Sequence, residues 1–170
     1  MAQDIDVFVG LAGIAGVFVG FAALISFTRR PEIEEHQLAH IRTVVTIGLL
    51  VIAATLLPIG LSRYGVEGHA LWLVCSLVFL SLVWYVGIMG LRRRENRQYV
   101  VTQAQTSPVT TAFFWLVLEL PIHVLLILAI LGLFPDLEPA FYTTALVIHL
   151  FEAAFVLAQL VYSQTLPTKA

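Results

Sequence analysis

Charged side chains are scarce in this sequence. Of its 170 residues, 12% are Asp, Glu, Lys or Arg and 59% are hydrophobic, whereas about a quarter of an ordinary soluble domain is charged. Together with a mean hydropathy of +0.93, this composition excludes an ordinary soluble domain and predicts an integral membrane protein. The net charge of -2, without a basic patch beyond the expected loop arginines, also argues against nucleic-acid binding.

Cysteine and the common catalytic motifs are nearly or wholly missing. The single cysteine, Cys75, cannot form an intrachain disulfide or a cysteine-based zinc site. No Walker, Rossmann or nucleophile-elbow motif occurs, so enzyme activity has no direct support. The first residues, Met-Ala-Gln-Asp-Ile-Asp, lack the positive charge of a cleavable signal peptide, and we expect the apolar run after them to be a membrane span.

Five apolar runs are long enough to cross the ~30 Å hydrocarbon core of a bilayer as helices. We therefore predict an all-α integral membrane protein, a bundle of five transmembrane helices in one domain covering 1–170. The short turn at 135–139 makes the last two helices antiparallel neighbours. The expected spans are about 6–27, 41–62, 69–91, 111–134 and 139–162.

The basic residues predict how the bundle is oriented. The positive-inside rule places the side richer in Lys and Arg in the cytoplasm, so we expect the N-terminus outside and the C-terminus in the cytoplasm. A bacterial inner membrane is the simplest location, because no organelle signal is evident. Only Arg63 lies on the outer side, and the inner side holds Arg29, Arg30, Arg42, Arg92, Arg93, Arg94, Arg97 and Lys169.

Small residues form a stripe along the first span, at Gly13, Gly16 and Gly20. Such a stripe lets another helix approach closely. The partner helix could belong to the same chain, to a second copy in a homo-oligomer, or to a larger membrane complex. The stripe alone does not distinguish these arrangements.

A polar stripe precedes the second span. Glu32, His36 and His40 are four residues apart and would share one helix face, and one Glu with two His is a recurrent metal-ligand set. A solvated helical turn with favourable Glu–His pairs explains the same residues. Three ligands on one short exposed stripe rarely converge on a single ion, so this metal site is a secondary hypothesis.

The third span carries residues that are typical of a membrane surface. His69 lies at the expected edge of the bilayer, where a histidine is normally solvated. Trp72 lies near one end of the span, and Trp84 and Tyr85 lie nearer the other. Aromatic residues at both ends are typical of interfacial belts.

The main functional signal is a carboxylate and an imidazole in the middle of each of the last two spans. Glu119 and His123 lie ~40° apart around a helix, and His149 and Glu152 lie ~60° apart. Each pair therefore shares a helix face. Because the two spans are antiparallel, the two glutamates should lie at one depth and the two histidines at another. Ionisable residues this deep in a membrane indicate a functional site by default.

Each histidine supplies a partner for the glutamate beside it. An ionised carboxylate at the bilayer centre costs at least ~2.5–3.5 kcal/mol on insertion scales, so such a partner is needed. Pro121 lies between Glu119 and His123 and has no amide hydrogen, which leaves the carbonyl of Val117 without its usual helical donor. We therefore expect a kink beside the site.

Our working hypothesis is a small channel or transporter for protons or cations, with Glu119, His123, His149 and Glu152 as its central site. Thr111 and Gln159 would extend this polar track towards the cytoplasm. Towards the outside the last two spans offer mostly leucine and isoleucine, with Tyr142 as the one polar group. The track therefore looks open inward and nearly closed outward.

Other interpretations of the same four residues stay open. They could bind a divalent transition metal, or His123 and His149 could be the axial ligands of haem b, in a redox protein or a sensor. The two Glu–His pairs could instead only hold the helix interface in register. The chain could also be an accessory subunit that packs inside a larger membrane complex.

Overall fold

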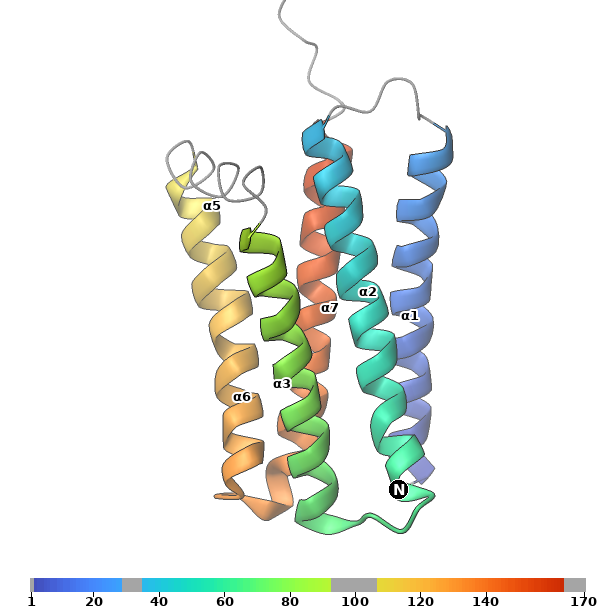
Figure 1. Cartoon of the computed structure of the whole chain (residues 1–170), viewed down its shortest axis with the longest axis vertical. Coiled ribbons are helices and arrows are strands. Elements are labelled where there is room, and N and C mark those ends of the chain that lie inside the picture. Colours follow the sequence, from blue (N-terminus) through green and yellow to red (C-terminus); the bar gives the residue numbers. More distant parts are fainter. Residues whose placement is uncertain (1, 29–34, 93–106, 164–170) are drawn as a thin grey trace, which may run out of the picture.

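The structure is a computed structural model that describes residues 2–28, 35–92 and 107–163. These residues form helices and turns and contain no strand. Five helical rods run side by side (Figure 1), and one of them is divided by a π-helical segment. The elements are α1 (Ala2–Thr28), α2 (Glu35–Ser62), α3 (Gly68–Arg92), α5 (Pro108–Phe113), η1 (Phe114–Glu119), α6 (Leu120–Leu131), η2 (Pro135–Leu137) and α7 (Glu138–Ser163).

All five predicted spans are helices that are long and apolar enough to cross a membrane, which confirms the all-α fold and fits a multi-pass membrane protein. The main difference is at helix starts. The polar residues before the second span are already helical from Glu35, and the fourth helix begins at Pro108, which occupies the first turn where its missing amide is harmless. The structural spans are Ile5–Thr28, Gln37–Ser62, Gly68–Gly90, Pro108–Leu131 and Pro135–Val161.

Helix α7 is the centre of the bundle, because it contacts α1, α2, α3, α6 and η1. Helix α1 lies at one edge and α5–η1–α6 at the other (Figure 1). The α2–α3 and α6–α7 turns lie at the same end as the start of α1, which we name the turn end. The opposite end carries Arg42 and Arg92, and we name it the basic end.

Four aromatic residues form the core near the turn end. The ring centroid of Tyr142 lies 5.7 Å from Trp72, 5.9 Å from Phe79 and 6.3 Å from Phe8. Tyr142 and Phe79 are fully buried. Trp72 is partly buried and packs against this core, and its place in an interfacial belt stays a prediction. Aromatic contacts of this kind join α1, α3 and α7.

The hydroxyl of Tyr142 donates a hydrogen bond of 2.7 Å to the carbonyl oxygen of Ala54 on α2. That carbonyl lies four residues before Pro58, which is inside α2 and has no amide hydrogen to donate to it. The tyrosine therefore supplies the donor that the proline removes. A buried carbonyl without water or protein partners would be costly in a membrane protein.

The expected irregularity beside Pro121 is a π-helix. The amide of Leu120 bonds to the carbonyl of Trp115, five residues back, at the end of η1. A π-helical turn contains an extra residue and rotates the side chains around it relative to a continuous α-helix. Glu119 is the last residue of this segment, so the distortion adjoins the predicted site.

The glycine stripe of α1 does not pack within the chain. A Cβ atom placed on Gly13, Gly16 or Gly20 would meet nothing within 4 Å. The small residue that allows α1 and α2 to approach is Gly48, where a Cβ would lie 2.5 Å from Val19 Cγ2 and 3.3 Å from the Ala15 carbonyl oxygen. The stripe therefore leaves an open surface on the edge helix.

Candidate functional site

The two predicted Glu–His pairs lie close to each other, about halfway along their helices. Glu119 ends η1, and His123 lies one turn later in α6. Both residues of the other pair, His149 and Glu152, lie in α7. Glu119 lies close enough to the other three residues to interact electrostatically with each of them. We name these four residues the central cluster.

A carboxyl–carboxyl contact has a definite chemical requirement. Ionised carboxylates have only acceptor atoms, so Glu119 and Glu152 can hydrogen-bond to each other only through a proton that one of them carries. Two carboxylates side by side also repel each other. A hydrogen bond between the two carboxyl groups would therefore hold a proton between η1 and α7.

In the pair on α6, the histidine is anchored by the backbone. His123 Nδ1 lies 2.8 Å from the carbonyl oxygen of Glu119. Because a carbonyl oxygen only accepts, Nδ1 is the donor, and Nε2 of the neutral ring is left to accept a proton. The nearer distance to the Glu119 carboxylate is 3.6 Å. The two side chains are 26% and 16% exposed, so this pair lies at the edge of the bundle.

The pair on α7 is buried. His149 Nδ1 lies 2.7 Å from Glu152 Oε2, and the side chains are 4% and 5% exposed. The two atoms are close, but their relative orientation is not that of a hydrogen bond. Both ring nitrogens of His149 and Oε2 of Glu152 therefore lack a hydrogen-bond partner within the described chain. Buried polar atoms normally have such a partner in protein or ordered water.

Two aromatic residues of α3 lie beside the two imidazoles, a contact that the sequence did not predict. The Phe79 ring meets His149 edge to face, with centroids 5.6 Å apart. Trp84 lies 6.4 Å from the ring of His123, and its outer side is exposed. Trp84 therefore contacts the central cluster, in addition to facing outward as an interfacial residue would. Aromatic faces stabilise a nearby cation, including a protonated imidazole.

The residues that were predicted to extend the polar track lie towards the basic end. Thr111 is in α5, and its hydroxyl is buried without a hydrogen-bond partner among the described residues. Gln159 is partly buried in α7. Neither Thr111 nor Gln159 is among the interaction partners given above for the four residues of the central cluster.

The second candidate metal site falls largely outside the described residues. Glu32 is not described, and His36 is in α2 but its side chain is not described. His40 is partly buried in α2. Across residues 2–28, 35–92 and 107–163, no group of three or more His, Cys, Asp and Glu side chains is arranged so that it could hold a metal ion. Metal and haem binding stay predictions that elemental analysis and a visible spectrum would test.

A second buried ionisable pair lies at the turn end. His69, the second residue of α3, places Nδ1 2.6 Å from Oε1 of Glu138, the first residue of α7. The imidazole is 44% exposed and the carboxylate 1%. His69 is exposed, as expected at the edge of the bundle, and in addition pairs with Glu138. The sequence held one signal for this pair, because the α2–α3 and α6–α7 turns had to lie on the same side of the membrane.

Gly132 makes room for the His69–Glu138 pair. It ends α6 with φ of 64°, in the left-handed region that a glycine adopts without strain. A Cβ at this position would lie 2.7 Å from Cε1 of the His69 ring. The same glycine thus stops the helix and lets the imidazole lie directly against the backbone.

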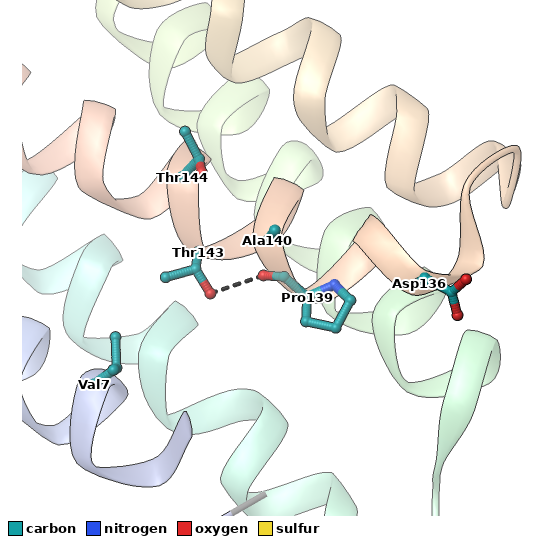
Figure 2. A pocket seen from close by; sticks show the side chains of 6 residues that line it. All are labelled: Val7, Asp136, Pro139, Ala140, Thr143 and Thr144. Carbon is teal, nitrogen blue, oxygen red and sulfur yellow. Dashed lines mark hydrogen bonds between the residues drawn. The ribbon is translucent and has the colours of Figure 1, made fainter. Parts of the chain in front are cut away.

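A pocket of about 400 Å³ lies between α1 and α7 near the turn end. Figure 2 shows Thr143 turned back to its own helix, where its hydroxyl donates to the carbonyl of Pro139 at 2.8 Å. None of the central cluster lines this pocket, so it is separate from the candidate site. Its lining residues are Val7, Asp136, Pro139, Ala140, Thr143 and Thr144.

Comparison of the chain with protein-family models, with curated proteins and with solved structures finds no significant match.

Proposed function

We propose that this protein conducts protons across a membrane and that the central cluster is the part of the route where protons cross between α6 and α7. The observation that carries this proposal is the proximity of Glu119 to Glu152, with one imidazole beside each carboxyl group. Ionisable side chains in the interior of a membrane bundle are typical of proton relays.

The cluster contains the groups that such a relay needs. A proton shared by the two carboxyl groups would have an imidazole close by on either side, since His149 lies 2.7 Å from Glu152 and His123 lies 3.6 Å from Glu119. Transfer requires the side chains to turn into hydrogen-bonding geometry. Imidazole accepts and releases protons near neutral pH. A hydrated metal cation would need several oxygen ligands around it, which is a less direct use of two carboxyl groups in contact.

The distribution of basic residues supports an orientation for this route. The end of α1, the start of α2 and the ends of α3 and α7 lie at the basic end (Figure 1), and the inner-side arginines and lysine lie in these segments or follow them in the sequence. By the positive-inside rule we place the basic end in the cytoplasm and the turn end outside. A bacterial inner membrane is the membrane we propose.

Proton flux into liposomes tests the proposal. Protein in liposomes that contain a pH-sensitive dye should respond to a potassium diffusion potential, made with valinomycin, by taking up protons faster than protein-free liposomes. The double substitution Glu119→Gln with Glu152→Gln should return the rate to that of protein-free liposomes, because Gln cannot carry the transferred proton. A wild-type rate equal to the protein-free rate would rule the function out.

We further propose that the open glycine face of α1 contacts a second copy of the chain. Gly13, Gly16 and Gly20 have free space beside them, and glycine interfaces allow close helix contact in membranes. Five helices can hardly enclose a wide aqueous pore, so a homo-oligomer is one way to give the route a wider polar surrounding.

Replacing Gly16 by Leu should separate the copies while leaving each chain folded, because the monomer has room for the new side chain. We expect the dissociation constant in detergent to rise at least ~10-fold, which corresponds to ~1.4 kcal/mol. Light scattering after size exclusion would measure it. The matched control is Gly60→Leu on α2, where the monomer is equally open. Equal masses for wild type and Gly16→Leu would contradict this interface, and a stable complex with another protein would favour the accessory-subunit interpretation.

A further inference from the structure

Buried polar atoms without hydrogen-bond partners follow one side of the bundle from end to end. Within the described residues, all such side-chain atoms belong to α3, α5 and α7, and none belongs to α1 or α2. On α2, by contrast, the hydroxyl of the fully buried Thr55 has a partner, because it donates to the carbonyl of Ile52 at 2.8 Å. The residues concerned are Ser76, Thr111, Glu138, His149 and Glu152.

Along α3, Ser76 lies between His69, which pairs with Glu138, and Phe79, which contacts His149. It follows His69 by seven residues, so the two share a face of α3 about 10 Å apart along the helix axis. One turn further along α3 is Phe79, whose ring lies against His149. Ser76 is fully buried, and its hydroxyl has no partner within the described chain.

Glu138 completes the row at the turn end. Its Oε1 is held by His69, whereas its Oε2 is buried and has no hydrogen-bond partner among the described residues. The imidazole of His69 is 44% exposed and can exchange protons with the surroundings of the bundle. The pair therefore has one exposed group and one buried free oxygen.

We propose that the outer half of the proton route runs from His69 and Glu138 through Ser76 to His149, with ordered water completing the hydrogen bonds between these groups. This inference rests on the proposed function. It replaces the expectation that the polar track is nearly closed outward. That expectation considered only the last two predicted spans, whereas His69 and Ser76 come from α3 and Glu138 lies just before the last predicted span. Buried water commonly satisfies such polar atoms.

The proton balance along this row is simple. His69 takes up a proton from outside and releases one from Nδ1 to Oε1 of Glu138. The neutral carboxyl group then turns about its Cγ–Cδ bond, so that the oxygen that carries the proton faces the hydrogen-bonded row and releases the proton there. The hydroxyl of Ser76 accepts one proton and donates its own, so it is unchanged afterwards. His149 receives the proton and passes it to Glu152, and no other reactant is consumed.

Glu138→Gln and Ser76→Ala test the inference in the liposome assay. We expect Glu138→Gln to lower the proton flux by at least ~10-fold, and Ser76→Ala by a similar factor, because each removes a group that must transfer the proton. The matched control is Thr55→Ala, which also removes a fully buried hydroxyl but one that is bonded within its own helix. Its flux should equal the wild-type flux.

The outcomes separate this inference from the proposed function. If Glu152→Gln lowers the flux while Glu138→Gln and Ser76→Ala do not, protons cross the central cluster but reach it by another route, and the inference is wrong. An equal loss of flux in Thr55→Ala would also overturn it, because the effect would then follow from any buried hydroxyl.

An experimental structure of the full chain in lipid, at a resolution that shows ordered water, provides a readout that does not depend on flux. We expect water within ~3 Å of Ser76 Oγ and of Glu138 Oε2. Direct protein partners for both atoms, without water, would overturn the inference even if wild-type protein conducts. Water at both atoms would support the row even if the liposome assay fails to detect conduction.

Discussion

Glu152→Gln is expected to lower the proton flux at least ~100-fold, the lower range for the loss of a group that transfers protons. Glu152 contacts His149 in its own helix and Glu119 on the other side of the α6–α7 interface. Gln has nearly the same shape and is neutral, so it does not leave a new charge buried in the bundle. The measurement is the initial rate of proton uptake per reconstituted protein.

The exposed glutamate of the α2–α3 turn provides the matched control. Glu67 is exposed and lies at the turn end, away from the central cluster, and Glu67→Gln should leave the flux unchanged. Helical content and thermal stability of both variants should match wild type. A folded Glu152→Gln protein with wild-type flux would show that the central cluster only holds α6 and α7 together.

Tyr142 is expected to have the largest effect on stability. Tyr142→Ala removes a fully buried ring from the contact with Phe8, Trp72 and Phe79, and we expect it to lower the free energy of unfolding by about 3–5 kcal/mol. Tyr142→Phe keeps the ring and removes the bond to Ala54, which should cost about 1–3 kcal/mol. Unfolding of the purified protein in mixed micelles would measure both.

A double-mutant cycle isolates the role of the tyrosine hydroxyl. Pro58→Ala restores an amide donor for the Ala54 carbonyl, so the loss caused by Tyr142→Phe should be smaller in that background. We expect a coupling free energy of about 0.5–3 kcal/mol, the range for residues that share a hydrogen bond. Additive effects of the two substitutions would mean that Tyr142 stabilises the bundle only through its ring.

Two glycines, Gly16 in α1 and Gly132 at the end of α6, have opposite surroundings. Gly16 is open in the monomer, whereas Gly132 lies against the ring of His69. The same residue type therefore marks a free surface in α1 and a filled contact at the end of α6. Only the neighbouring helices distinguish the two uses.

Local sequence was sufficient for the membrane architecture. Length and apolar character decide whether a helix can span a bilayer, and both are properties of a continuous segment. All five spans were predictable for that reason. The pairing of Glu119 with His123 and of His149 with Glu152 was also predictable, because helical periodicity alone puts each pair on one face.

The tertiary structure decided which groups meet across helices. Phe79 and Trp84 contact the two imidazoles because of the way α3 is rotated against α6 and α7. Tyr142 reaches the carbonyl that Pro58 leaves without a donor because α2 packs against α7. Periodicity defines a helix face but not its neighbour. The burial of Glu138 beside His69 likewise depends on three helix ends that meet at one side of the bundle, and no continuous segment of the chain encodes that meeting.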